Sequence, residues 1–193
     1  MLGLKLATDP RWVNLAEKSI EEILTDHAYC EQKATSACIA LIQNFPEKDY
    51  LVHKLMPVVH EEWTHFKLVL DELKKRNLKL GTQRKDEYVL QLNKFFTKGN
   101  TRETRFLDHV LMAGLIEARS CERFRLLSLE INDEALKKFY HHLMIAEANH
   151  YKMFLDIALH YFEKDKVKDR WNAWLDFETK ILENMQLRGD RIH

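Results

Sequence analysis

The sequence predicts an all-α protein built around four long helices. Only 5 glycines and 3 prolines occur in 193 residues, which is too few for a turn-rich β architecture. Apolar residues recur at three- and four-residue steps along most of the chain, as they do on one face of an amphipathic helix. A chain of this length is most simply one domain, so we expect residues 1–193 to form a single unit.

The first two core helices are expected at about residues 11–44 and 49–77. Asp9-Pro10 is a helix-start signal, because aspartate caps a helix and proline fits its first position. Within the first helix, Thr25-Asp26 marks a possible break. In the second helix, Pro57 predicts a kink or a restart, since proline removes an internal hydrogen bond.

The other two core helices are expected at about residues 101–130 and 133–163, and Asn132-Asp133 can cap the second of these. Accessory helices are expected at about residues 85–97 and 168–185. The charged stretch "EKDKVKD" should separate the last accessory helix from the core.

The lengths of the connections predict how the helices are joined. Short loops join the first helix to the second and the third to the fourth, so each pair should form an antiparallel hairpin. Roughly 20 residues lie between the two hairpins, and at 1.5 Å or more per residue they can travel the length of a bundle. One long crossover in the middle is the ferritin-like variant of the four-helix bundle, which is the fold we predict.

The composition excludes several classes of protein. The chain has 30 basic and 30 acidic residues, so nothing global indicates binding to nucleic acid or membranes, and any such surface must be local. Its three cysteines form no Cys-x-x-Cys pair, which argues against a disulfide framework and favours a reducing compartment. We see no signal peptide and no run of apolar residues that could span a membrane, and therefore expect a soluble, cytoplasmic protein.

A glutamate interrupts the inward apolar stripe near the middle of each long helix, and in two helices a histidine follows three residues later. Buried carboxylates without partners would each cost several kcal/mol, whereas two divalent cations would neutralise all four. A mixed carboxylate and imidazole set favours iron or manganese over calcium. The predicted metal ligands are Glu31, Glu62, His65, Glu117, Glu147 and His150.

The spacing of these residues supports the same set. The lone glutamate precedes the Glu-x-x-His motif by 31 residues in the first half of the chain and by 30 in the second. Two neighbouring candidates fail this test: Glu122 lies only 25 residues before Glu147, and Glu61 has no counterpart because Ala146 occupies the matching position. The predicted site is therefore repeated in the two halves of the chain.

The stretch "HEEWTHF" at residues 60–66 resembles the zinc-protease motif His-Glu-x-x-His but does not match it. That motif needs two histidines four residues apart on one helical face, whereas His60 and His65 are five apart. Neither His60 nor Glu61 lies on the inward stripe. We therefore exclude a zinc-protease site and assign no role to these two residues.

Two further residues near the predicted site have alternative interpretations. His27 lies one turn before Glu31 and is either a hydrogen-bonding partner of that ligand or an ordinary, partly buried histidine. Gly114 either opens space for oxygen or substrate or permits close helix packing. The remaining histidines are expected at the surface; they are His53, His109, His141, His142, His160 and His193.

Four segments together resemble the tRNA-(2-methylthio-N6-isopentenyladenosine) hydroxylase family. They are "DHAYCEQKA" (26–34), "EEWTHF" (61–66), "GLIEARSCERF" (114–124) and "AEANHY" (146–151). The resemblance runs from Pro10 to the C-terminal "RGDRIH". It implies a ferritin-like di-iron monooxygenase that hydroxylates the isopentenyl group of a modified adenosine beside the anticodon of tRNA.

The resemblance also implies the cofactors and partners of the protein. It implies two iron ions, dioxygen as co-substrate, two electrons from an external donor, and the same six ligands that the helical pattern indicates. The partners would be the tRNA anticodon loop and an unidentified reductase, with no membrane, and the protein would be a monomer or a small homo-oligomer. An apolar channel between the helices would suit the prenyl group.

The tRNA phosphates would need a local patch of cations near the mouth of that channel. Candidates for this patch are Arg119, Arg123, Arg125, Lys98, Arg102, Arg105, Arg188 and Arg191, although each could equally be an ordinary solvated charge. Two other functions are compatible with the pattern. One is a ferritin-like protein for iron oxidation, iron storage or peroxide detoxification, and the other is a metal-free helical interaction module.

Overall fold

The computed structural model describes residues 2–96 and 99–193, and every regular element among them is helical. The four long helices are α2 (Ile20–Asn44), α3 (Asp49–Lys75), α5 (Arg102–Glu130) and α6 (Glu134–Tyr161). The shorter elements are α1 (Arg11–Glu17), α4 (Glu87–Leu92), the 3-10 turn η1 (Asn93–Phe95) and α7 (Lys164–Asn184). The predicted all-α class is therefore confirmed.

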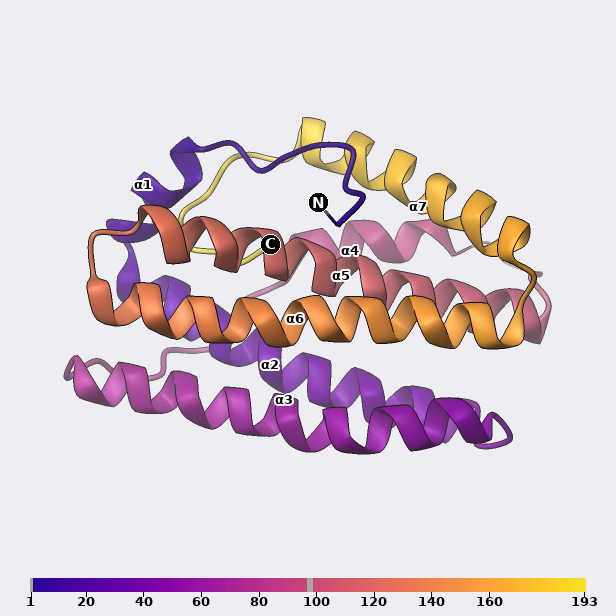
Figure 1. The fold of residues 1–193 in the computed structure, drawn as a ribbon. Coiled ribbons are helices and arrows are strands. Elements are labelled where there is room, and N and C mark those ends of the chain that lie inside the picture. Colours follow the sequence, from indigo (N-terminus) through magenta and orange to yellow (C-terminus); the bar gives the residue numbers. More distant parts are fainter. Residues whose placement is uncertain (1, 97–98) are drawn as a thin grey trace.

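The four long helices form two hairpins that lie side by side (Figure 1). Helix α2 packs against α3, and α5 packs against α6, with only a few residues in each connecting loop. The crossover from α3 to α5 spans residues 76–101 and carries α4 and η1. Helix α7 packs against α4 and α5, on the opposite side of the bundle from α3. This is the predicted ferritin-like arrangement.

Side chains cap the starts of two of the long helices, and the cap predicted at Asn132-Asp133 is confirmed. The carboxylate of Asp133 accepts hydrogen bonds from the backbone N–H groups of Ala135 and Leu136, so it caps α6. Thr101 caps α5 in the same way, with its hydroxyl accepting from the N–H of Thr104. The carboxylate of Asp9 accepts from the N–H of Arg11, but α1 begins at Arg11 with Pro10 as its N-cap, so the expectation that Asp9 is the cap and Pro10 the first helical residue is wrong by one position.

The break in the first predicted helix lies at Lys18 and Ser19, between α1 and α2, and the prediction of a break near Thr25-Asp26 is wrong. Thr25 and Asp26 lie inside α2 and are buried, because other segments of the chain use their polar atoms. The Thr25 hydroxyl accepts from the N–H of Gly81, and the Asp26 carboxylate accepts from the N–H of Ile192.

Two other boundaries differ from the expected ones. Helix α3 continues through Pro57 without a restart. Helix α7 begins at Lys164, inside the charged stretch, because Val167 lies on the buried face of this first turn and is only 4% exposed. The accessory helix expected at about 85–97 corresponds to α4 and η1, and residue 97, like the candidate cation Lys98, lies outside the described residues.

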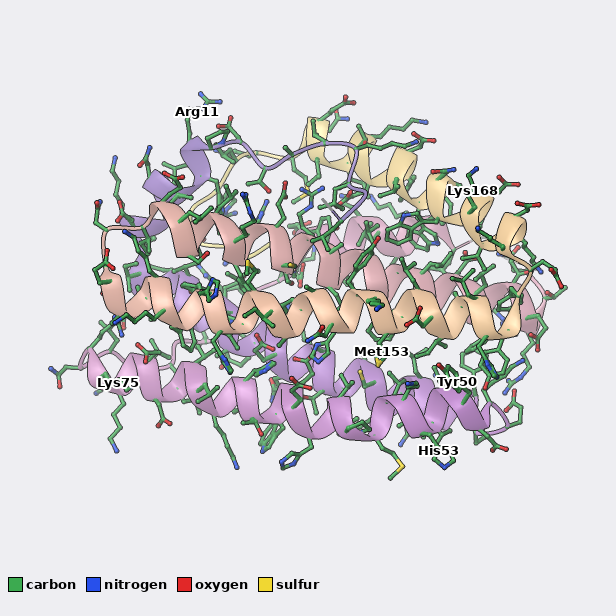
Figure 2. The ribbon with its side chains drawn as sticks, viewed as in Figure 1. Arg11, Tyr50, His53, Lys75, Met153 and Lys168 are labelled. Carbon is green, nitrogen blue, oxygen red and sulfur yellow. The ribbon has the colours of Figure 1, made fainter. Side chains whose placement is uncertain are left out.

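Two apolar clusters fill the bundle and leave a polar layer between them. One cluster contains the first half of α3 and α5 and the last half of α6, with residues such as Leu55, Leu111 and Phe154. The other contains the opposite halves of these helices, with residues such as Leu73 and Tyr140. The side chains fill the space between the helices (Figure 2). The mid-helix glutamates lie in the layer between the two clusters.

The C-terminal tail, residues 185–193, turns back from α7 and packs along α1, α2 and α5. Gly189 lies so close to the backbone of Leu15 in α1 that an added Cβ would overlap it. Ile192 is fully buried and His193 is 9% exposed, so the expectation that His193 lies at the surface is wrong. None of the helices in the described ranges is long and apolar enough to cross a membrane.

Candidate metal centre

All six predicted ligand residues come together in the polar layer of the bundle. Each long helix contributes one glutamate, and α3 and α6 each contribute a histidine one turn later. None of the six is more than 6% exposed. Their positions follow from the amphipathic pattern, since residues on the inward stripe of four packed helices converge at mid-height.

The six residues form two overlapping sets, and within each set the potential ligand atoms lie within 4.8 Å of one another. One set contains Glu31 and His65, and the other contains Glu117 and His150. Glu62 and Glu147 belong to both sets. The glutamates of the Glu-x-x-His motifs therefore occupy the centre, with one lone glutamate and one histidine on each side.

Both histidines turn the same ring atom toward the carboxylates. The Nδ1 atom of His65 lies 3.5 Å from an oxygen of Glu62, and the Nδ1 atom of His150 lies 2.9 Å from the other oxygen. The Nε2 atoms face away from this centre and toward Glu61, at 3.9 Å for His65 and 3.2 Å for His150. The Nδ1 atoms are thus available to a cation, while Glu61 can hold both rings from outside.

Glu61 is the residue near the site that the sequence analysis missed. Its side chain is 48% exposed, which agrees with its position off the inward stripe, yet its carboxylate reaches the two histidines of the site. The four-residue spacing from Glu61 to His65 was the available signal, because residues four apart on a helix are neighbours. The contact with His150 crosses between helices and has no signal in the local sequence.

His27 is a direct partner of Glu31. Its Nε2 atom lies 2.6 Å from a carboxylate oxygen of Glu31, and its ring is fully buried. The imidazole packs among Phe124, Phe139 and Tyr140, with ring centroids 4.7 to 5.9 Å away. Of the two interpretations of His27, the structure therefore favours the hydrogen-bonding partner.

The crowding of acidic groups shifts their pKa values. Burial, together with the charge of Glu31, raises the pKa of Glu62 to about 8. Burial and the neighbouring Glu117 raise the pKa of Glu147 well above its usual value. Burial would lower the pKa of His65, but the nearby carboxylates of Glu31 and Glu62 favour the protonated ring more strongly and raise this pKa to about 10. Without added positive charge, the site therefore retains protons at neutral pH.

The donor set fits two divalent cations. Several buried atoms at the centre have no hydrogen-bond partner among the described residues, and they include both oxygens of Glu62, one oxygen of Glu147 and the Nδ1 atoms of both histidines. Buried polar atoms are normally satisfied, and these point into a shared space. Two cations would neutralise the four carboxylates and would also accept the free lone pairs.

A cavity of about 280 Å³ adjoins the carboxylates, and the oxygen-bearing residues Glu31, Glu62, Glu117 and Glu147 form part of its wall. Most of the remaining wall is apolar and includes Leu41, Met112, Ala113, Ile116 and Phe154. The polar residues are Cys30, Lys33, Asp86, Ser120 and His193. The cavity can therefore hold an apolar group beside the candidate metal centre.

Gly114 does not line this cavity. A Cβ atom at this position would lie 3.2 Å from Cβ of Phe154 in α6, which is a tight contact. Gly114 therefore permits the close approach of α5 and α6, and this is the second of the two roles considered for it.

The chain is similar to a family of known proteins and to named relatives in two bacteria. The family described as tRNA-(MS[2]IO[6]A)-hydroxylase (MiaE) matches residues 2–193. A relative from Pseudomonas putida (strain KT2440), named tRNA 2-(methylsulfanyl)-N(6)-isopentenyladenosine(37) hydroxylase, is 32% identical over 154 residues, which cover 80% of this chain and 74% of the relative. A relative of the same name from Salmonella typhimurium (strain LT2) is 25% identical, with the same coverage.

A solved structure is similar over nearly the whole chain. It is described as protein 43 with aldehyde deformylating oxygenase activity from Synechococcus, and it shares 32% sequence identity with a TM-score of 0.91. The similarity covers 98% of this chain and 94% of that one. From the family match over residues 2–193 and from the relatives, we conclude that the chain belongs to the tRNA-(MS[2]IO[6]A)-hydroxylase family.

Proposed function

We propose that this chain is a di-iron monooxygenase that hydroxylates the isopentenyl group of 2-methylthio-N6-isopentenyladenosine in tRNA. Membership of the family and the names of the relatives support the substrate. The observation that carries the reaction type is the pair of overlapping carboxylate and histidine sets beside an apolar cavity.

Six residues would hold the two iron ions, with Glu31 and His65 on one ion and Glu117 and His150 on the other. Glu62 and Glu147, which belong to both sets, would contribute to holding both ions. Bound iron would supply the activation of dioxygen, with two electrons from an external donor. The apolar wall would orient the isopentenyl group toward the metal centre and exclude water from it.

Two residues outside the ligand set would hold the ligands in place. His27 would fix the carboxylate of Glu31 through its 2.6 Å contact. Glu61 would hold the ring of His150 through the 3.2 Å contact between its carboxylate and the outer nitrogen, Nε2. Neither residue needs to touch the substrate for this role.

The reaction is tested with purified protein loaded anaerobically with Fe(II). The protein is mixed with the modified nucleoside, a chemical reductant and labelled dioxygen, and the products are analysed by mass spectrometry. We expect one labelled oxygen atom in the isopentenyl group, and no product with Glu147→Gln. The absence of any hydroxylated nucleoside with iron-loaded wild-type protein, together with unchanged tRNA nucleosides in a gene deletion, would refute the substrate assignment.

A second candidate function is the removal of the formyl group from an apolar aldehyde. The Synechococcus protein with that activity shares 32% of its residues with this chain, and the apolar cavity would also accommodate an aliphatic chain. The same iron-loaded protein is therefore incubated with aliphatic aldehydes, and the headspace is analysed for hydrocarbons. Hydrocarbon without nucleoside hydroxylation would favour this candidate.

The ferritin-like storage alternative differs in assembly. Storage of iron requires a shell of many subunits, whereas a tRNA-modifying enzyme needs only an accessible site. We propose a monomer or a small homo-oligomer, and size-exclusion chromatography with light scattering tests this. A shell-sized particle that deposits iron would support the storage alternative instead.

A further inference from the structure

A second and larger cavity, of about 650 Å³, lies between residues 6–11, α5 and the C-terminal tail. Five arginines contribute to its wall; they are Arg11, Arg119, Arg123, Arg188 and Arg191. The carboxylates in the wall belong to Asp9, which pairs with Arg11, and to the exposed Glu87. This cavity shares His193 with the apolar cavity, so the two adjoin at that side chain.

Arg123 is buried in this wall without a counter-charge. It is 8% exposed and has no carboxylate partner in the described part of the chain. Its Nη1 atom donates to the backbone carbonyl of Ile192, and its Nε atom has no acceptor. The charges of Glu122 and Glu178 act on Arg123, but both carboxylates are paired with Arg119.

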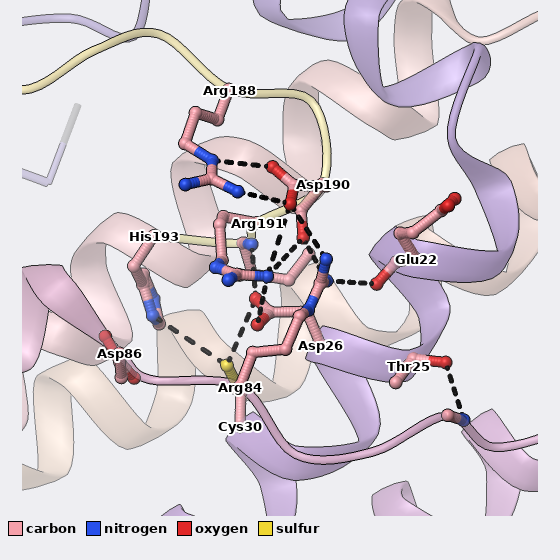
Figure 3. Close-up of polar contacts among 12 residues, drawn as sticks. Glu22, Thr25, Asp26, Cys30, Arg84, Asp86, Arg188, Asp190, Arg191 and His193 are labelled. Atoms are coloured by element: carbon pink, nitrogen blue, oxygen red, sulfur yellow. Dashed lines mark hydrogen bonds and ion pairs between the residues drawn. The ribbon is translucent and has the colours of Figure 1, made fainter.

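The tail contributes Arg188 and Arg191 to the wall of the cavity, and Arg84 of the crossover lies beside them although it is not part of that wall. Arg84, Arg188 and Arg191 all approach the single carboxylate of Asp190, at 2.8, 2.8 and 3.4 Å (Figure 3). Arg191 also lies 3.6 Å from Asp26. These three guanidinium groups thus share two carboxylates, and Arg123, which has no ion pair in the described ranges, lines the same cavity as Arg188 and Arg191.

From this excess of buried and rim charge we infer that the arginine-lined cavity binds a backbone phosphate of the RNA substrate. A buried guanidinium is costly without a counter-ion, and its planar fork matches phosphate oxygens. The inference rests on the proposed function, because it assigns the two adjoining cavities to two parts of one RNA strand. The isopentenyl group occupies the apolar cavity, and a phosphate near the modified nucleotide occupies the arginine-lined cavity.

The first test measures binding of a fluorescent RNA hairpin with the anticodon stem and loop, by anisotropy at several salt concentrations. We expect Arg123→Gln to weaken binding about tenfold and to reduce the salt dependence by about one phosphate contact. Arg188→Gln should also weaken binding. Because the Arg188 side chain is half-exposed at the rim, this variant tests the inference even if Arg123→Gln folds poorly. Arg123→Lys, which keeps the charge, should restore part of the affinity.

Arg125→Gln is the matched control, because Arg125 lies two residues further along α5, is exposed and does not line the cavity. It removes the same charge and should leave both the affinity and the salt dependence unchanged. Equal effects of Arg123→Gln and Arg125→Gln, or no effect of Arg123→Gln and Arg188→Gln, would overturn the inference.

The second test compares turnover of the hairpin with turnover of the free modified nucleoside, which has no phosphate. The ratio of kcat/KM for the hairpin to kcat/KM for the nucleoside should fall at least about tenfold in Arg123→Gln. Equal losses on both substrates would indicate a purely structural role and would overturn the inference. If wild-type protein hydroxylates neither substrate, the proposed function fails, while the binding test still decides the phosphate site.

Inorganic phosphate distinguishes the RNA backbone from a free anion. We expect phosphate to compete with the hairpin for wild-type protein, and to compete less with Arg123→Gln. If phosphate raises the Tm of wild-type but not Arg123→Gln protein and leaves hairpin binding unaffected, the site takes a free anion and the assignment to RNA is wrong.

Discussion

Glu61 and Glu62 are adjacent in the sequence but lie in different environments. Glu62 is 1% exposed and lies between both histidines, whereas the Glu61 side chain is 48% exposed and contacts the histidines from outside. The two positions are one helical step apart, about 100° around α3. Glutamine at either position removes one negative charge. A difference between the two variants therefore distinguishes a metal ligand, the proposed role of Glu62, from a residue that holds the histidine rings, the proposed role of Glu61.

We predict that Glu62→Gln abolishes tight iron binding, whereas Glu61→Gln retains both ions with affinity lowered about 10- to 100-fold. Glu62 lies within reach of both metal positions, so its loss affects both. Iron per chain, measured by mass spectrometry after dialysis, and competition with a chelator test this prediction. Full iron occupancy in Glu62→Gln would contradict the proposed ligand set.

Helix α7 is anchored to the bundle by a buried carboxylate on α5. Asp108 is fully buried and accepts hydrogen bonds from the indole N–H of Trp174, at 3.2 Å, and from Arg170, at 2.6 and 2.8 Å. Trp174 is itself fully buried and packs against Phe95 of the crossover. Asp108 is thus one of two buried polar anchors described for α7; in the other, Glu178 of α7 accepts hydrogen bonds from Arg119 of α5 and Tyr88 of α4.

We expect Trp174→Phe to lower the free energy of unfolding by about 1–3 kcal/mol, since it leaves a buried carboxylate one donor short. Trp174→Ala should lower it by about 3–5 kcal/mol, because it also opens a cavity. The control is Trp171→Phe on the same helix, where the ring is partly exposed. Urea unfolding followed by circular dichroism measures all three, and equal stabilities for Trp174→Phe and wild type would contradict the proposed anchor.

The tail should respond to acid through His193. Burial lowers the pKa of His193 to about 3; the charge of Asp86 opposes this shift, while Arg123 and Lys33 add to it. When the tail is detached, His193 has the ordinary histidine pKa of about 6.5. As the pH falls, the detached tail therefore binds a proton at a higher pH than the packed tail does. The packing of the tail against the bundle therefore keeps its full stability above about pH 6.5 and loses stability progressively as the pH falls toward about 3.

We predict that hydrogen exchange in residues 189–192 is faster at about pH 5 than at about pH 7.5 by on the order of tenfold, after correction for the intrinsic rate. The Ser120 hydroxyl lies 2.9 Å from the His193 ring, so helix α5 should report the same event locally. In His193→Asn the additional pH dependence should disappear. If the same pH dependence of hydrogen exchange persists in His193→Asn, a titratable group other than His193 causes it.

At the scale of the whole molecule, the candidate metal centre lies between two apolar clusters and joins all four long helices. Binding of cations to the folded state alone stabilises that state by mass action. Metal-free protein should therefore gain about 2.7 kcal/mol when the free metal reaches about 100 times its dissociation constant, and its Tm should rise by roughly 5–10 °C.

Calorimetry with anaerobic Fe(II) or with Mn(II) measures this shift, and Glu62→Gln is the control that should show little of it. A rise in Tm of the same size in both proteins would mean that the cations stabilise the fold from elsewhere. Either result is independent of the enzymatic assay.

The bundle and the six central residues could be predicted because both depend on a local period. A helix repeats every 3.6 residues, so Glu62, His65 and the apolar residues of α3 reveal their shared face in sequence alone. The lengths of the loops then indicate the order of the helices. No contact between distant segments is needed for these two conclusions.

The resemblance to the family implied an apolar channel and a patch of cations, but the path of the tail, the position of the two cavities and the role of Glu61 could not be predicted, because they arise from contacts between distant segments. Asp26 and Ile192, for example, are 166 residues apart and join through a single hydrogen bond. Thr25 and Asp26 are typical helix-breaking residues in the local sequence. Their hydrogen bonds to Gly81 and Ile192 explain why α2 nevertheless continues through them.

The close contact between Gly189 and Leu15 sets a volume limit on the tail. A single methyl group at residue 189 would overlap the backbone of α1, which cannot yield as a flexible side chain does. Gly189→Ala should therefore displace the tail without removing any charged side chain from the chain. Because the tail separates the two cavities at His193, its displacement should connect the arginine-lined cavity to the apolar one. Faster hydrogen exchange of the Ile192 amide would show that the tail has moved.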